Sequence, residues 1–144
     1  MAVKKIFFIL FIALATLLFT SCDIDDGVSF NFVPLQIVSV EVPESFDLNR
    51  THQIRVTYLR PNGCTSFQGF DISNPDTTVR NVVVIGAVRA DEACSQETAE
   101  VEVSFDFIAL FTDTYLFRFW TGEDTDGESQ YLEVEVPVNA TPIN

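Results

Sequence analysis

Apolar and polar residues alternate along most of the chain after residue 27, and no segment there repeats its apolar residues at the 3.6-residue spacing of an amphipathic helix. The alternation is strict between residues 99 and 107, where each apolar residue is followed by a glutamate, serine or aspartate. This pattern predicts a β-strand with one buried face and one face in water. The same pattern recurs in residues 115–120, with Tyr115, Phe117 and Phe119 on one face, and in residues 131–138, with Leu132, Val134 and Val136 on one face.

Further apolar runs predict strands at residues 28–33, 37–42, 52–59, 64–72 and 79–90. Residues that favour turns separate these runs, at Pro34, Pro43, 61–63, 74–76 and 122–127. About seven or eight short strands with no helix between them predict an all-β fold built from antiparallel pairs. We expect a single immunoglobulin-like β-sandwich domain over residues 28–138, followed by a short C-terminal tail at 139–144.

Residues 113–117 resemble the tyrosine corner of immunoglobulin-like domains, in which a tyrosine near the start of a strand bonds back to the preceding backbone. Tyr115 would be that tyrosine. The position two residues later, where such domains usually carry a cysteine, is Phe117. A disulfide in this chain would therefore differ from the usual bond between the two sheets.

The first 21 residues have the order of segments found in a secretory signal peptide. Lys4 and Lys5 precede an apolar run at residues 6–19, and Thr20 and Ser21 precede Cys22. The apolar run has 14 residues, whereas a transmembrane helix needs about 20. The pattern predicts a cleaved leader at residues 1–21.

Residues 18–22, LFTSC, resemble the lipobox of bacterial lipoproteins, in the looser form of Bacteroidota-type bacteria. The resemblance implies that Cys22 carries the lipid anchor and that the mature protein is held at the outer membrane. Ordinary cleavage with an unmodified Cys22 is the alternative. The acidic residues 23–26, in the tether 22–27, resemble a signal for export to the cell surface, and a solvated spacer explains them equally well.

The chain as a whole resembles small lipoproteins of Bacteroidota-type bacteria that carry one immunoglobulin-like domain. Residues 1–27 carry this resemblance, together with the segment TYLFRFWTG that ends at Gly122. The resemblance implies a location and a fold, and it implies no activity.

Cys64 and Cys94 remain once the anchor is set aside, and an even number of cysteines in an exported chain predicts a disulfide. On the chain-entropy account such a bond contributes about 3–4 kcal/mol of stability. Two free thiols, or a metal pair, are the alternative, but no histidine or further cysteine lies close by in the sequence.

The chain carries 21 acidic residues against 8 basic ones, a formal charge of −13. Both lysines lie in the predicted leader, so the mature chain is more acidic still. Such a surface repels phosphate backbones, which excludes nucleic acid as a partner. The expected partners are a membrane, through the lipid anchor, and an envelope protein or a glycan.

The chain contains one histidine, His52, and no pairing of a nucleophile with a base, so we expect no catalytic residues and no enzyme. His52 lies at the start of a predicted strand, on the face of Ile54 and Val56, where a packed histidine is the simpler interpretation.

No cofactor is expected. A partial match to a calcium loop offers Asp124, Asp126, Glu128 and Glu133 as candidate calcium ligands, although Gly122 occupies the first ligand position and an acidic hairpin loop explains the segment as well.

Trp120, Glu123 and Asp124 are the candidate binding surface, because a tryptophan on the face opposite Phe119 adjoins the acidic loop. A tryptophan that covers the edge of the core is the alternative interpretation.

The sequence therefore predicts an outer-membrane-anchored, non-enzymatic binding or structural module, facing either the cell surface or the periplasm. A calcium-dependent glycan-binding or adhesion domain and an inhibitor of a cationic hydrolase are the alternative functions.

Overall fold

The structure, a computed structural model, describes residues 29–89 and 93–140. The predicted leader, the tether with Cys22 and the end of the C-terminal tail lie outside these ranges. The described residues form β-strands and no helix, which confirms the prediction of an all-β fold. The strands are β1 (Phe30–Leu35), β2 (Ile37–Glu41), β3 (Phe46–Asp47), β4 (Thr51–Arg60), β5 (Thr65–Asp76), β6 (Val79–Arg89), β7 (Ala99–Ile108), β8 (Tyr115–Glu123), β9 (Ser129–Val136) and β10 (Val138–Asn139).

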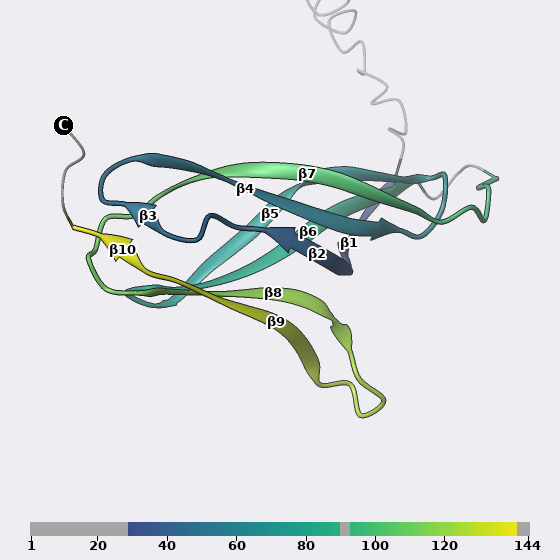
Figure 1. Ribbon diagram of the computed structural model, residues 1–144. Helices are drawn as coiled ribbons and strands as arrows, with labels where there is room; N and C mark the ends of the chain where they lie inside the picture. The colour runs from purple at the N-terminus through teal and green to yellow at the C-terminus, as the bar shows by residue number, and fades with distance from the viewer. Residues whose placement is uncertain (1–28, 90–92, 141–144) are drawn as a thin grey trace, which may run out of the picture.

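Two sheets form the layers of the fold (Figure 1). The larger sheet has the strand order β5-β6-β8-β9. β1 and β8 pair with the same edge of β6, β8 with its first residues and β1 with its last. The smaller sheet has the order β2-β4-β7. A two-residue ladder between β3 and β10 lies at one end. The arrangement is consistent with the predicted sandwich.

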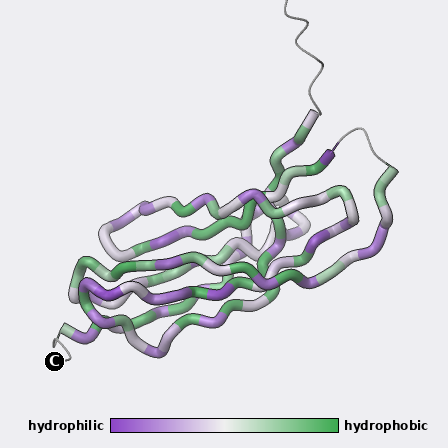
Figure 2. Tube along the Cα trace, turned by 90° about the horizontal axis from the view of Figure 1, so that it is seen from above, coloured by the Kyte–Doolittle hydropathy of each residue, from purple (hydrophilic) through white to green (hydrophobic). Residues whose placement is uncertain are grey.

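The core lies between the two sheets and is built from the inward faces that the alternation predicted. Tyr115, Phe117 and Phe119 of β8 are fully buried against Ile54 and Val56 of β4. Figure 2 shows hydrophobic and hydrophilic residues alternating along the strands. Full burial of one such side chain stabilises the fold by about 1.5–3 kcal/mol.

The pairing of the strands corrects one expectation, because two ladders are parallel. β6 pairs with β8 in parallel over residues 79–82 of β6, and β3 pairs with β10 in parallel. β7, which comes between β6 and β8 in the chain, lies in the other sheet. β6 and β8 therefore run in the same direction, and their contact within one sheet has to be parallel.

Two prolines expected to interrupt strands lie inside them instead. Pro34 is paired with Ile85 within β1, and Pro75 lies within β5. In the described chain both strands are edge strands that pair with β6 alone. An edge strand has backbone N–H groups that need no ladder partner, so it accepts proline where a central strand does not.

The chain passes from one sheet to the other at Gln36, between β1 and β2. Leu35 in the larger sheet and Ile37 in the smaller sheet are both buried. The carbonyl oxygen of Gln36 accepts a hydrogen bond from the N–H of Leu59 at 2.9 Å. This crossing ties the two layers together at one edge of the sandwich.

Tyr115 has the geometry of a tyrosine corner. Its side chain is fully buried, and its hydroxyl oxygen accepts hydrogen bonds from the N–H groups of Leu110 and Phe111 at 3.1 and 3.2 Å. These bonds hold the loop that leads from β7 into β8. The short distance in sequence explains why a local motif could be predicted here.

The predicted disulfide between Cys64 and Cys94 is present, with the two Cα atoms 5.3 Å apart. It joins the turn before β5 to the loop before β7. The same junction has further contacts, because the N–H of Gly63 donates to the carbonyl of Ser95 at 3.0 Å and the side chain of Asn62 accepts from the N–H of Cys64 at 3.0 Å.

We expect replacement of Tyr115 by phenylalanine to lower the free energy of unfolding by about 1–3 kcal/mol, because two backbone N–H groups lose their acceptor while the ring stays buried. Urea unfolding of the variant measures this loss. Tyr131→Phe is the matched control, since Tyr131 is half-buried and is not part of the corner. Equal losses in the two variants would show that the corner contributes nothing.

We expect the double variant Cys64→Ser, Cys94→Ser to lose about 3–4 kcal/mol, because the unfolded chain regains the entropy of an open loop of 30 residues. Urea unfolding under non-reducing conditions measures the loss. The wild-type chain treated with a reductant should unfold at the same midpoint as the variant. An unchanged midpoint in both would contradict the prediction.

Candidate binding groove and acidic hairpin

A surface groove of about 340 Å³ lies beside Trp120. Three parts of the chain form its walls: the crossing from β1 to β2, the end of β4, and the end of β8. Its lining residues are Pro34, Leu35, Gln36, Leu59, Pro61, Trp120, Thr121, Gly122 and Glu123.

The groove exists because β8 and β1 pair with successive parts of the same edge of β6, one after the other. β8 pairs with β6 up to Val82, and β1 pairs with β6 from Val84 onwards, on the same side. Beyond Phe119, β8 continues only with β9 and turns away from the sandwich, as Figure 1 shows. A change of register falls between Trp120 and Gly122, whose φ of 122° is a conformation that a side chain rarely adopts.

The groove combines apolar walls with a few polar groups. Pro34, Leu59 and Pro61 contribute aliphatic surface, and Trp120, which is half-buried, contributes an aromatic ring. Gln36, Thr121 and Glu123 add an amide, a hydroxyl and a carboxylate. Apolar walls with a small number of polar groups are typical of ligand-binding sites.

The structure brings Trp120 and Glu123 of the predicted binding surface together in this groove, and it places Asp124 outside the lining. The remaining lining residues were not predicted as binding residues. In the sequence, Pro34 and Pro61 are typical of turns and Leu59 is typical of a strand. A groove assembled from three segments distant in sequence leaves no local pattern from which it could be found.

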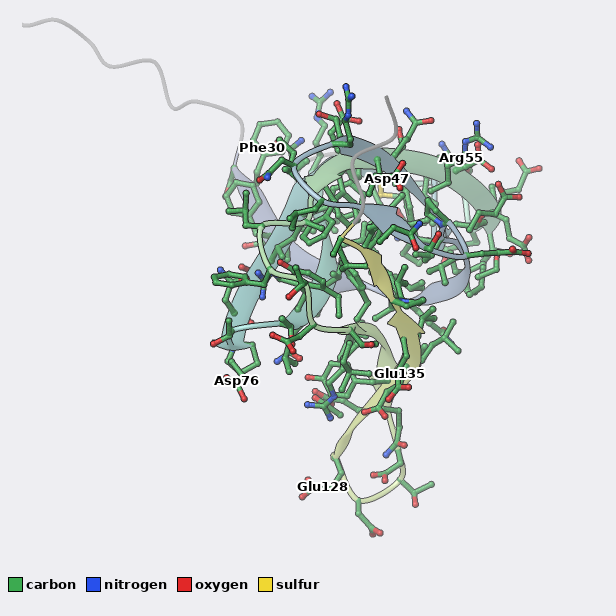
Figure 3. The ribbon with its side chains drawn as sticks, turned by 60° about the vertical axis from the view of Figure 1, so that its left-hand side comes forward. Phe30, Asp47, Arg55, Asp76, Glu128 and Glu135 are labelled. Atoms are coloured by element: carbon green, nitrogen blue, oxygen red, sulfur yellow. A yellow bond between two sulfur atoms is a disulfide. The ribbon has the colours of Figure 1, made fainter. Side chains whose placement is uncertain are left out.

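Asp124 holds the turn of the β8–β9 hairpin. Its Oδ1 atom accepts hydrogen bonds from the N–H groups of Asp126 and Glu128, both at 2.9 Å, and its Oδ2 atom accepts from the Gln130 amide at 2.8 Å. Gly127, with a φ of 81°, completes the turn. Figure 3 shows this hairpin projecting from the sandwich, with Glu128 near its tip.

The candidate calcium ligands do not form a cluster. Asp124 is occupied by the bonds of the turn, and Glu133 lies on β9, where its Oε1 atom accepts a hydrogen bond from Arg118 at 2.9 Å. Among residues 29–89 and 93–140, no three acidic, histidine or cysteine side chains lie close enough together to hold a metal ion.

His52 is packed at the end of the core. Its ring lies 5.0 Å from the ring of Phe46, and its Nε2 atom accepts a hydrogen bond from the N–H of Asp47 at 2.9 Å. The Tyr58 phenol, stacked on Phe67, has a pKa raised by burial, which the charge of Arg60 partly offsets. It therefore stays protonated at neutral pH. Neither group lines the groove.

The chain matches no known family model, no curated protein and no solved structure. Within the described ranges, the structure contains no helical segment with the length and hydrophobicity needed to cross a bilayer.

We expect Asp124→Ala to loosen the hairpin tip, because the N–H groups of residues 126 and 128 lose their shared acceptor. Their hydrogen exchange should accelerate, while the global free energy of unfolding changes by less than about 1 kcal/mol, since the site is exposed. Exchange followed by NMR measures both. Asp126→Ala is the control, because in the described structure the Asp126 carboxylate accepts none of these bonds.

The wild type and the Asp124→Ala variant together also test the calcium alternative. Because the Asp124 oxygens are already bonded within the turn, we expect millimolar calcium to leave the melting temperature of the wild type unchanged. A rise that disappears in Asp124→Ala would establish calcium binding and contradict this expectation.

Proposed function

We propose that this chain is an exported lipoprotein, held at the outer membrane by Cys22, whose sandwich binds a ligand in the Trp120 groove without chemical turnover. The groove is the observation that carries the binding role. It offers an aromatic ring, aliphatic walls and three polar groups, and it contains no histidine or cysteine.

The anchoring rests on the sequence before the folded domain. Lys4 and Lys5, the apolar run at 6–19 and the segment LFTSC give the order of basic, apolar and small residues that precedes a lipid-modified cysteine. Several acyl chains hold a protein on a bilayer firmly, because each buried CH₂ contributes about 0.8 kcal/mol.

An immunoglobulin-like relationship is part of the proposal. The tyrosine corner at Tyr115 and the two-layer arrangement support it. The parallel pairing of β6 with β8 is a departure from an antiparallel arrangement of that kind. The proposed domain is accordingly a variant of the sandwich in which β8 lies beside β6.

The ligand class that fits the groove best is an uncharged glycan. A sugar ring has an apolar face that stacks on an aromatic ring, while its hydroxyl groups need hydrogen-bond partners such as Gln36, Thr121 and Glu123. The acidic character of the chain disfavours anionic ligands. Calcium-dependent adhesion and hydrolase inhibition stay predictions from the sequence.

A glycan array probed with the wild-type protein tests the binding role. We expect binding of neutral glycans, and Trp120→Ala should weaken the strongest interaction by at least about tenfold, equivalent to about 1.4 kcal/mol. Tyr131→Ala is the matched control, because Tyr131 pairs with Trp120 across β8 and β9 but does not line the groove. An array without binding, or equal losses in both variants, would refute the glycan proposal.

Cell fractionation tests the anchor separately. We expect the wild type in the outer-membrane fraction with fatty acid attached to its N-terminal residue, and Cys22→Ser in the soluble fraction or retained as an uncleaved precursor. An epitope tag at the C-terminus, probed on intact and then on permeabilised cells, decides which side of the membrane the domain faces. A Cys22→Ser protein that is processed and membrane-bound like the wild type would refute lipid anchoring.

A further inference from the structure

The outward faces of both sheets carry charged residues, with Asp71, Arg118, Glu133 and Glu135 on the larger sheet, but only the larger sheet also has a run of outward apolar residues. On the smaller sheet, β7 turns Glu100, Glu102, Ser104 and Asp106 outward, and β4 adds Gln53 and Arg55. On the larger sheet, the outward positions of β6 include Val83 and Ile85, since the alternate residues Val82 and Val84 are fully buried in the core. The larger sheet therefore has an apolar strip on the side that water would be expected to cover.

The sequence of β6 agrees with this observation. Residues 82–88 form an unbroken run of apolar residues and glycine, a pattern typical of strands that are covered on both faces. In the described part of the chain the smaller sheet covers one face of β6 only. On the other face Ala87 is fully buried within the domain, whereas Val83 and Ile85 are half-buried, so these two residues have apolar surface left to cover.

β1 extends this apolar strip to the N-terminal end of the domain. Phe32 pairs with Ala87 and Pro34 with Ile85, so Phe32 and Pro34 share the outward face with Ile85. Phe32 is 70% exposed and Phe30 is 46% exposed. We define the β1 face as Phe30, Phe32, Val83 and Ile85, and leave out Pro34 because it lines the groove beside Trp120.

The β1 face lies next to the proposed anchor. Phe30 follows Cys22 by eight residues, which span at most roughly 29 Å when fully extended. Figure 3 labels Phe30 at the end of the sandwich where the described chain begins. An anchored domain thus keeps its two most N-terminal phenylalanines within reach of the bilayer surface.

We propose that the β1 face rests on the lipid bilayer that carries the anchor, with Phe30 and Phe32 at the level of the headgroups. This inference rests on the proposed anchoring at Cys22. Aromatic and aliphatic side chains bind at the boundary between headgroups and acyl chains, and charge decides which face turns to the lipid. The outward acids of β7 disfavour contact with phosphate groups, whereas the β1 face itself is uncharged and has one acid, Asp71 opposite Val83, at its margin.

The contact gives the domain a fixed orientation. Attachment at Cys22 alone would not determine which face of the sandwich turns to the bilayer, because a single lipid-modified residue fixes a distance and not an orientation. With the β1 face on the lipid, the outward acids of β7 point away from the membrane.

Quenching of tryptophan fluorescence by brominated lipid tests the proposal. The chain has a single tryptophan, so Trp120→Phe provides a background in which Phe32→Trp is the only fluorophore. The acylated protein is recovered from membranes and reconstituted into phosphatidylcholine vesicles with or without dibrominated acyl chains. We expect the Phe32→Trp protein to lose roughly half of its emission or more in the brominated vesicles, because the ring lies at the acyl boundary.

Phe111→Trp in the same background is the matched control. Phe111 is 45% exposed, much like Phe30, but it lies in the loop between β7 and β8 at the other end of the sandwich. We expect no quenching at this position. Equal quenching at both positions, or none at position 32, would overturn the proposal, as would a crosslinked dimer that covers position 32 without contact with lipid.

The anchor and the orientation are measured independently. The mass of the N-terminal peptide shows whether Cys22 is acylated. Where it is not, the processed chain can be coupled through the Cys22 thiol to a maleimide-bearing lipid, since the other two cysteines form the disulfide. In that protein, quenching at position 32 would support contact between the β1 face and lipid even though the natural anchor is refuted. An absence of quenching would refute that contact.

Discussion

The packing of Phe46 between the two sheets is the interaction on which the fold depends most. Its ring lies 5.1 Å from Phe107 of β7, 5.9 Å from Phe117 of β8 and 6.2 Å from Tyr115. Phe46 belongs to the two-residue strand β3, which pairs with β10. One side chain therefore joins both layers and fixes the small ladder near the C-terminal end of the described chain.

This packing also explains why the end of the sandwich near β3 is closed and the opposite end is open. Near Phe46, His52 packs on the ring and the guanidinium of Arg80 lies 5.2 Å from the ring of Tyr115. At the opposite end, β8 leaves β6 after Phe119 and β1 crosses to the other sheet at Gln36. The groove beside Trp120 lies at this end, between β8, the crossing from β1 to β2, and the end of β4.

The strands with strict alternation could be predicted from the sequence, because every second residue is apolar and the same residues are the buried ones. β7 exposes every second residue as its pattern indicates, and the inward face of β8 is fully buried. Leu132 of β9 is an exception, because it continues the apolar pattern but is 39% exposed where the hairpin extends beyond the core. The pairing partners could not be predicted, because alternation reports a buried face and not the neighbouring strand.

The candidate site was only partly visible in the sequence for a related reason. Trp120 and Glu123 stand out by residue type, whereas Pro34 and Leu59 enter the groove only through the crossing at Gln36. The acids of the hairpin could equally be ligands or turn residues, and in the structure Asp124 accepts hydrogen bonds from two backbone N–H groups of the turn. Residue type identifies the chemistry that is available, and the fold determines which groups remain free to use it.

The shortness of β1 has a geometric consequence for the groove. Phe30 begins this strand, and Pro34 and Leu35 near its other end line the groove. At about 3.3 Å per residue, the groove wall stands less than roughly 20 Å from the first residue of the strand. A constraint on the position of Phe30 would therefore also limit the position of the groove, and under the proposed anchoring a ligand of the groove would have to lie within a narrow layer above the membrane.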